Sequence, residues 1–306
     1  MQREDFTFDS RDGHTKIHAV RWIPDGEVKY ILQIIHGMAE YMERYEHMAR
    51  WLCDRGVLVT GEDHLGHGAT VPEGGTYGYF APDDPATIVV RDVHRLKKMT
   101  QSLYPDVPYY MMGHSMGSFI IRNYMFKYGT GIKGAIVCGT ATHPPIEVKM
   151  GMLLANIQKL FLGDKHVAMM LNNMSLGTSS KTPYEERFEW LCCDRDVINR
   201  YIEDPLCGFC FTVNGFRTLF TLLDRQNKMK NLEKMPKELP VMIIAGSEDP
   251  VGNCGKGVIY VKNQYEKLGM KDVFFKLYDG LKHEIFNEKE KETVFEDIYS
   301  WITKER

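Results

Sequence analysis

The sequence predicts an α/β fold in which a mostly parallel central sheet carries helices on both faces. From about residue 30, short apolar runs alternate with longer amphipathic stretches, and this alternation is typical of parallel strands joined by crossover helices. The short runs are apolar along nearly their whole length, as expected for strands that are covered on both faces. The alternation stops once, over residues 144–225. We therefore expect one core, formed by residues 1–143 and 226–306, with an inserted and mainly helical cap.

The first part of the core is expected to open with a β-hairpin. Residues 6–8 and 16–22 alternate between apolar and polar side chains, and Asp12-Gly13 between them is a strong turn signal. Strands and helices should then follow in turn. The predicted strands are 30–35, 57–63, 107–112 and 134–139, and the predicted helices are 41–55, 86–103 and 118–128. The basic run Arg95-Leu96-Lys97-Lys98 is interpreted as a solvated helix face.

The second part of the core resumes the same alternation after the cap. The pattern predicts strands at 240–246 and 273–278 and helices at 257–268 and 291–303. The cap itself has two strongly apolar segments, at 150–162 and 167–174. An insertion into a parallel α/β sheet emerges at the carboxyl ends of the strands, so we expect the cap to cover that edge.

Composition and charge exclude several classes of function. The formal net charge is −3 and no long run of one sign occurs, so nucleic acid is not an expected partner. The polar N-terminus leads into no apolar signal segment, and no apolar run is long enough to span a bilayer. The seven cysteines are odd in number and irregularly spaced, which favours free thiols and a cytoplasmic location.

The pair Cys207-x-x-Cys210 has a spacing that occurs in zinc and redox sites. The other cluster, Cys192-Cys193, has no common ligand spacing, so the sequence offers no second half for such a site. Small buried side chains are the favoured interpretation of these cysteines. We expect neither a metal nor a cofactor.

The turn between the predicted strand at 107–112 and the helix at 118–128 reads Gly113-His114-Ser115-Met116-Gly117. A serine on so tight a turn has a strained backbone, and glycines on either side leave room where a Cβ would collide. The turn exposes the Ser115 hydroxyl above the sheet and aims the Met116 N–H at the place where an oxyanion would form. A glycine-rich connection without chemistry is the alternative for this motif taken alone.

A serine nucleophile needs a general base, and the base needs a group that orients it. His283 follows the last predicted strand and Asp249 follows the preceding one, so both belong to the same sheet edge as Ser115. The order Ser115, Asp249, His283 is the one that this connectivity requires. The competing histidines are interpreted as structural: His36, His64, His67 and His114. His36 is expected to hold the loop that presents the Met38 N–H as the second oxyanion donor.

Five motifs together resemble the α/β-hydrolases of the monoacylglycerol lipase and lysophospholipase group. They are His36-Gly37-Met38-Ala39-Glu40 with Arg44-Tyr45, Asp63-x-x-Gly66-His67-Gly68, Gly113-His114-Ser115-Met116-Gly117, Asp249-Pro250-Val251 and His283-Glu284-Ile285-Phe286-Asn287-Glu288. The resemblance covers residues 6–143 and 226–304, and it implies the α/β-hydrolase fold and a serine ester hydrolase with a cap. Met38 stands where a small residue is common in the family, and Glu40-Tyr41 replaces a frequent Glu-His pair.

The resemblance implies hydrolysis of lipid-like carboxylic esters, such as monoacylglycerols or lysophospholipids, through a Ser-His-Asp triad and an acyl-enzyme. We expect the cap to line an apolar tunnel, with Leu154 and Met170 among the substrate-binding residues, and to contact membrane surfaces transiently. Three alternatives stay open: an esterase of short-chain esters, a ligand-binding protein without chemistry, and an aminopeptidase of the proline-releasing kind. The last needs cap carboxylates for the substrate amine, and the candidates are Glu185, Glu186, Glu189 and Asp194.

Overall fold

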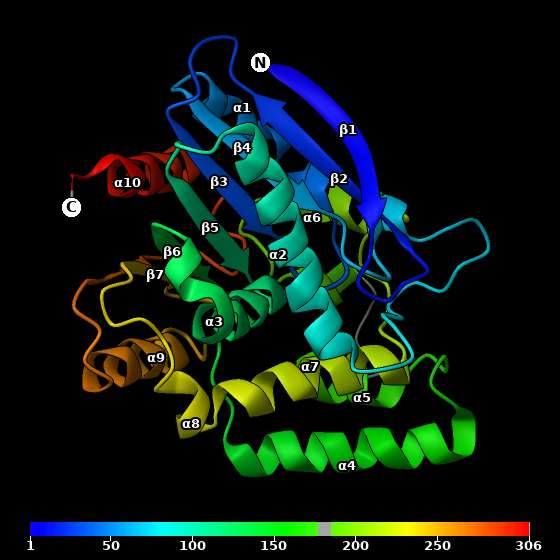
Figure 1. Cartoon of the computed structure of the whole chain (residues 1–306). Coiled ribbons are helices and arrows are strands. Elements are labelled where there is room, and N and C mark those ends of the chain that lie inside the picture. Colours follow the sequence, from blue (N-terminus) through cyan, green and yellow to red (C-terminus); the bar gives the residue numbers. More distant parts are fainter. Residues whose placement is uncertain (177–184, 306) are drawn as a thin grey trace.

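The computed structural model describes residues 1–176 and 185–305. Within these ranges, eight strands form one sheet in the order β1-β2-β4-β3-β5-β6-β7-β8 (Figure 1). Their bounds are β1 (Gln2–Asp9), β2 (Lys16–Ile23), β3 (Tyr30–Ile35), β4 (Val57–Glu62), β5 (Tyr109–His114), β6 (Gly134–Cys138), β7 (Val241–Gly246) and β8 (Val273–Tyr278). Six neighbouring strands are parallel to one another: β4, β3, β5, β6, β7 and β8. In contrast, β2 is antiparallel to both β1 and β4. The prediction of a mostly parallel α/β sheet is confirmed.

Helices cover both faces of the sheet, each against its own cluster of buried apolar side chains. One face carries α1 (Glu46–Cys53) and α10 (Lys291–Thr303). The opposite face carries α2 (Pro85–Leu103), α3 (Met116–Tyr128) and α9 (Lys256–Lys267). Because helices cover both faces, the central strands β3 to β7 are buried almost throughout.

Two local predictions about the helices need correction in part. The segment predicted as a helix at 41–55 begins with a 3₁₀ turn, η1 (Met42–Tyr45), and only then continues as α1. The basic run on α2 is not a fully solvated face, because Lys97 is buried while Lys98 is exposed. The Lys97 ammonium lies 5.5 Å from the centre of the Tyr109 ring and donates a hydrogen bond to Gln101. A lysine can bury its aliphatic stem in this way, and burial lowers the pKa of Lys97.

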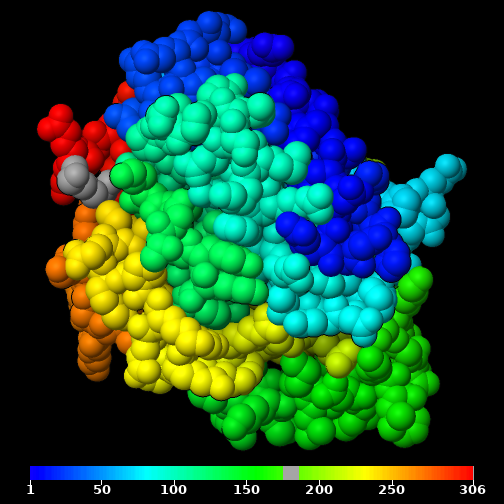
Figure 2. Space-filling view, viewed as in Figure 1, coloured from blue at the N-terminus to red at the C-terminus, as the bar shows by residue number. Residues whose placement is uncertain are grey.

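Residues 144–225, which we call the cap, are mainly helical in their described part. The cap elements are α4 (Pro145–Leu162), α5 (Met169–Leu176), η4 (Glu185–Phe188), α6 (Arg195–Glu203) and α7 (Val213–Gln226), and α8 (Met229–Leu232) then leads to β7. α7 packs on α2 and α3 of the core, and α4 packs on α7. In the space-filling view the green surface of α4 is outermost, next to the yellow surface of α7 (Figure 2). The division of the chain at residues 143 and 226 stays a prediction.

The outer helix α4 leaves most of its apolar side chains in contact with solvent. Only Val148 and Ala155 of this helix are buried. The exposed apolar residues, which we call the α4 face, are Ile146, Met150, Leu153, Ile157, Leu160, Phe161 and Leu162. Exposed apolar surface of this extent marks interaction sites rather than ordinary solvated surface. No helix within the described ranges is long and apolar enough to cross a membrane.

Candidate active site

Ser115 occupies a sharp turn between β5 and α3. Its backbone has φ 53° and ψ −120°, and a positive φ is rare for a residue with a side chain. A Cβ on Gly113 would lie 2.2 Å from the carbonyl oxygen of Gly117, and one on Gly117 would lie 1.9 Å from that of Ile35. Both positions therefore need glycine. The turn is fixed further by the Ser115 N–H, which donates to the Cys138 carbonyl of β6 over 3.0 Å.

Asp249 and His283 meet at the same edge of the sheet. Asp249 follows β7 and His283 follows β8, and His283 Nδ1 lies 2.9 Å from Asp249 Oδ2. The other carboxylate oxygen of Asp249 accepts the Val251 N–H over 2.9 Å. Burial by itself would raise the pKa of Asp249, but the charge and hydrogen bond of His283 lower it below its usual value. Burial by itself would lower the pKa of His283, but Asp249 raises it above its usual value.

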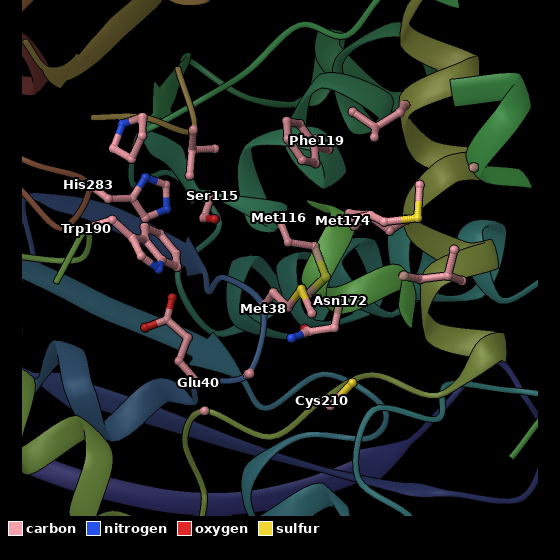
Figure 3. Close-up of a pocket in the computed structure, with 18 of the residues that line it drawn as sticks. Met38, Glu40, Ser115, Met116, Phe119, Asn172, Met174, Trp190, Cys210 and His283 are labelled. Carbon is pink, nitrogen blue, oxygen red and sulfur yellow. The ribbon is translucent and has the colours of Figure 1, made fainter. Parts of the chain in front are cut away.

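The second ring nitrogen of His283 is available for proton transfer. Its Nε2 atom is buried and has no hydrogen-bond partner within the described residues. Figure 3 shows the Ser115 side chain beside the His283 ring. In this arrangement Asp249 fixes the imidazole orientation on one edge and leaves the other edge facing the serine. A serine, an imidazole and a carboxylate so placed can carry out acyl transfer.

The loop after β3 is held from both sides by buried polar groups. The Gly37 N–H donates to Glu40 over 2.6 Å, and Ala39 has a positive φ of 54°. His36 Nε2 accepts the His64 N–H over 3.0 Å, so its Nδ1 carries the proton that is donated to the Gly37 carbonyl at 2.8 Å. Burial lowers the pKa of His36 and keeps it neutral. The loop therefore has one fixed course, with Met38 at the cavity.

A buried ion cluster connects this loop with the segment after His283. Arg44 Nη1 and Nη2 donate to the two oxygens of Glu284 over 2.6 and 2.7 Å, and Nη1 also donates to Glu40 over 2.8 Å. The Arg44 guanidinium lies 4.7 Å from the ring centre of Tyr201 on α6, whose hydroxyl donates to the Ala39 carbonyl. Sequence reasoning assigned no role to these three charges. The signals that they gave were their place in two of the five family motifs and their position beside Gly37-Met38 and His283.

A cavity of about 660 Å³ lies above Ser115. Ser115, His283, Met38 and Met116 lie together along one side of it (Figure 3). Most of the remaining wall is apolar and comes from the cap: Val148, Met150, Leu154, Met169, Leu171, Met174, Leu219 and Phe220. The volume is within the range of about 300–1,000 Å³ that is typical of ligand pockets.

One of the two predicted substrate-binding residues is misplaced. Leu154 of α4 lines the cavity. Met170 is 47% exposed and is not part of the wall, whereas its neighbours Met169 and Leu171 are. Placing Met170 at the cavity was therefore wrong. The helix α5 has apolar side chains in succession, so its sequence does not distinguish the inner face from the outer one.

Three of the four carboxylates proposed to hold a substrate amine, Glu186, Glu189 and Asp194, are not part of the cavity wall. Glu186 is exposed, Glu189 pairs with Arg195 over 3.0 Å, and Asp194 caps the N-terminus of α6. The side chain of Glu185 lies outside the described part of the chain. Among the residues that the structure describes, the carboxylates that line the cavity are Glu40, Glu147 and Glu284, and two of these three bind Arg44.

The cysteines form no ligand cluster. All seven are free thiols, with Cys207 buried and Cys210 half-buried at the cavity. Over residues 1–176 and 185–305, no group of three or more His, Cys, Asp and Glu side chains is arranged to hold a metal ion. Burial raises the pKa of Cys210 to about 11, so its thiol stays protonated at neutral pH.

Comparison with known proteins places the chain in a family. A family model described as "Serine aminopeptidase, S33" matches residues 26–290. A monoacylglycerol lipase from Mycolicibacterium smegmatis is 26% identical over 288 residues, covering 92% of this chain and 90% of the relative, and the human monoglyceride lipase is 27% identical over 296 residues, covering 92% and 85%. A thermostable carboxyl esterase from Bacillus coagulans, solved with glycerol, is 31% identical with a TM-score of 0.88, covering 99% of this chain and 98% of that one. The chain therefore belongs to the serine aminopeptidase S33 family of α/β-hydrolases and is a serine hydrolase.

Proposed function

We propose that this protein hydrolyses carboxylic esters that join an acyl chain to a small polar alcohol, such as monoacylglycerols or lysophospholipids. One observation carries the proposal. The hydrogen-bonded pair of His283 and Asp249 lies with Ser115 at a mainly apolar cavity of about 660 Å³. The names of the relatives, which include monoacylglycerol lipases and a carboxyl esterase, support an ester as the substrate. The free thiols support a reducing, cytoplasmic location.

The proposed reaction proceeds through an acyl-enzyme. Ser115 Oγ attacks the ester carbonyl carbon while its proton moves to His283 Nε2, and Asp249 stabilises the imidazolium. The tetrahedral oxyanion accepts hydrogen bonds from the N–H groups of Met38 and Met116. Collapse of this intermediate releases the alcohol, which takes the proton from His283. Water, activated by the same imidazole, then hydrolyses the acyl-Ser115 ester.

The apolar wall supports an acyl chain as the larger part of the substrate. Each methylene buried in such a wall contributes about 0.8 kcal/mol. The kcat/KM for ester hydrolysis should therefore rise with the length of the acyl chain until the chain fills the cavity. A short-chain esterase, the nearest alternative, would show no such rise.

The exposed α4 face supports a substrate that is taken from a lipid surface, with the cap acting as a lid. We test this with vesicles of phosphatidylcholine that contain a monoacylglycerol. Leu160→Ser and Phe161→Ser, at positions that are 79% and 77% exposed, should reduce co-sedimentation with the vesicles. Leu103→Ser is the matched control, because Leu103 is an exposed leucine (61%) on α2 of the core. An equal loss in all three variants, or in none, would refute surface contact through α4.

Aminopeptidase activity is the less favoured function. A substrate amine needs a carboxylate that is not already neutralised. Glu40 and Glu284 line the cavity, but both bind Arg44. Glu147 is 63% exposed and faces His143 at 3.9 Å. The family description alone favours peptides, whereas the human relative is named a monoglyceride lipase.

A substrate panel tests the proposed function. Wild type and Ser115→Ala are assayed with p-nitrophenyl esters of increasing length, a monoacylglycerol, a lysophospholipid and a proline amide. We expect ester hydrolysis that rises with chain length, loss of activity by several orders of magnitude in Ser115→Ala, and labelling of wild type alone by a fluorophosphonate. Cleavage of the amide in preference to every ester, or full activity of Ser115→Ala, would overturn the proposal.

A further inference from the structure

A short segment of the cap is bound directly to the backbone on either side of His283. The His283 N–H donates to the Trp190 carbonyl over 3.4 Å, and the Glu284 N–H donates to the Leu191 carbonyl over 2.7 Å. The Glu288 carboxylate accepts the N–H groups of both Lys282 and Cys193 at 3.1 and 2.9–3.0 Å. These hydrogen bonds tie cap residues 190–193 to the loop that carries His283.

The same segment places an aromatic ring against the imidazole. The Trp190 and His283 rings have centres 5.0 Å apart and are tilted by 53°. The His114 ring lies 4.7 Å from His283, so the imidazole has an aromatic neighbour from the cap and another from the core. Trp190 is itself fixed, because its indole N–H donates to the Arg187 carbonyl over 2.8 Å. Figure 3 shows the indole beside His283 at the cavity.

This geometry has a chemical consequence for a histidine that takes up a proton. An aromatic face attracts a cation within about 6 Å of its centre, and tryptophan does so most strongly. His283 is 1% exposed, so water screens this attraction little. The indole therefore interacts more favourably with the imidazolium than with the neutral ring.

We propose that Trp190 is a positioning residue that acts through His283: it orients the imidazole and stabilises its protonated form during acyl transfer. The proposal rests on the proposed function, because it takes His283 to be the general base. It also makes the cap a part of the catalytic apparatus, in addition to its role as a wall for the acyl chain. The other charged and titratable groups around His283 are Asp249, His114, Glu40, Glu284 and Arg44, and the test leaves all of them unchanged.

The test compares pH profiles of kcat/KM on a short ester, p-nitrophenyl acetate, which makes few contacts with the acyl cavity. Trp190→Leu keeps an apolar side chain without the aromatic face, and Trp190→Phe keeps a smaller face. We expect Trp190→Leu to lower kcat about five- to tenfold with little change in KM. The acidic limb should move to lower pH by about 0.5–1 unit, because the imidazolium is less stabilised. Trp190→Phe should lie between the leucine variant and wild type.

Tryptophans carrying increasing numbers of ring fluorines, incorporated at position 190, weaken the aromatic face stepwise while the indole N–H, a stronger donor after fluorination, keeps its hydrogen bond to the Arg187 carbonyl. With each added fluorine, the acidic limb of the kcat/KM profile should move to lower pH, and kcat should decrease. Trp51→Leu is the matched control, since Trp51 packs on Phe295 and Tyr299 of α10, and it should leave the profile unchanged. If the wild type hydrolyses esters but fluorination at position 190 does not shift the acidic limb, the proposed role of Trp190 is refuted and the proposed function is not. A wild type that neither hydrolyses esters nor reacts with a fluorophosphonate would instead refute the proposed function.

Discussion

At the scale of single residues, the environment of His283 is built by groups that are far apart in the sequence. Asp249 binds one ring nitrogen, His114 and Trp190 contact the ring, and Nε2 is left without a partner in the described chain. Asp249 acts on the balance between the neutral and the protonated imidazole, and we propose that Trp190 does so too. The carboxylate has the largest effect, because it is charged and hydrogen-bonded.

Replacing Asp249 by Asn should expose the contribution of this charge. Asp249 raises the pKa of His283 against the effect of burial, so its removal should lower that pKa. We expect kcat/KM for an ester to fall by about 10³–10⁴-fold, and the acidic limb of any residual activity to lie at lower pH. Steady-state assays across pH 4–9 measure both effects. Near-native turnover would mean that another carboxylate, such as Asp279 or Glu248, orients the histidine.

Arg44 binds two buried carboxylates of the site, Glu40 and Glu284. The side chains of Glu40 and Glu284 are 3% and 2% exposed. Arg44→Met should therefore destabilise the protein by about 3–5 kcal/mol in urea unfolding, because it removes the guanidinium that both buried carboxylates bind. The double variant Arg44→Met with Glu284→Gln should recover part of this loss, since one buried charge is removed. If the double variant is as unstable as the single one, lost packing of the arginine on Tyr201 is the cause.

At the scale of elements, the cap is where sequence reasoning succeeds least. Strands buried on both faces, glycine turns and strand-end residues have local signals, and the predicted α/β-hydrolase fold is confirmed. The cap helices α4 and α5 are apolar on more than one side, so their sequence does not show which face lies over Ser115. Met170 was misplaced for this reason. The Arg44–Glu284 pair joins residues separated by 240 positions, which no local pattern can indicate.

The proposed roles of Ser115, Asp249 and His283 stay predictions, although the structure brings the three together. Their local signals were a glycine-flanked turn and two strand ends. Trp190 had no such signal, because its contact with His283 depends on how the cap folds back on the core.

Adjacent leucines of α4 give a matched test of the acyl cavity. Leu154 lines the cavity, whereas Leu153 is 54% exposed on the same helix. Leu154→Asp should lower kcat/KM for dodecanoyl esters by at least about tenfold more than for acetyl esters, because a buried carboxylate disfavours the chain. Leu153→Asp should leave both activities on dissolved esters nearly unchanged. Equal losses on both esters in Leu154→Asp would indicate general damage to the cap.

At the scale of the whole molecule, the N-terminal hairpin is fastened to the core through Asp92 of α2. Asp92 accepts the Ser10 hydroxyl over 2.7 Å and the Arg11 N–H over 2.6 Å. Burial raises the pKa of Asp92 to about 6. The folded protein therefore keeps this carboxyl protonated in a pH range in which the unfolded chain has lost the proton.

The sign of the pH dependence follows from this difference. Asp92 contributes stability that is fully present below about pH 4 and is lost as the pH rises through 6. Asp92→Asn keeps an acceptor for Arg11 and cannot ionise. The measured quantity is the free energy of unfolding of wild type minus that of Asp92→Asn. As the pH rises from 4 to 7, this difference should decrease by up to about 3 kcal/mol. Urea titrations at several pH values measure it, and a difference that is independent of pH would contradict the prediction.

The order of the strands also constrains how the protein is made. β6 and β7 are neighbours in the sheet, yet the whole cap is synthesised between them. Once β6 has emerged from the ribosome, Ser115 has also been synthesised. At that stage β6 still lacks its neighbour β7, and an unpaired strand edge of this kind can pair incorrectly with other segments. That edge must be shielded while about a hundred further residues emerge. Asp249 and His283 arrive only afterwards, so ester hydrolysis should begin only after their release, late in translation.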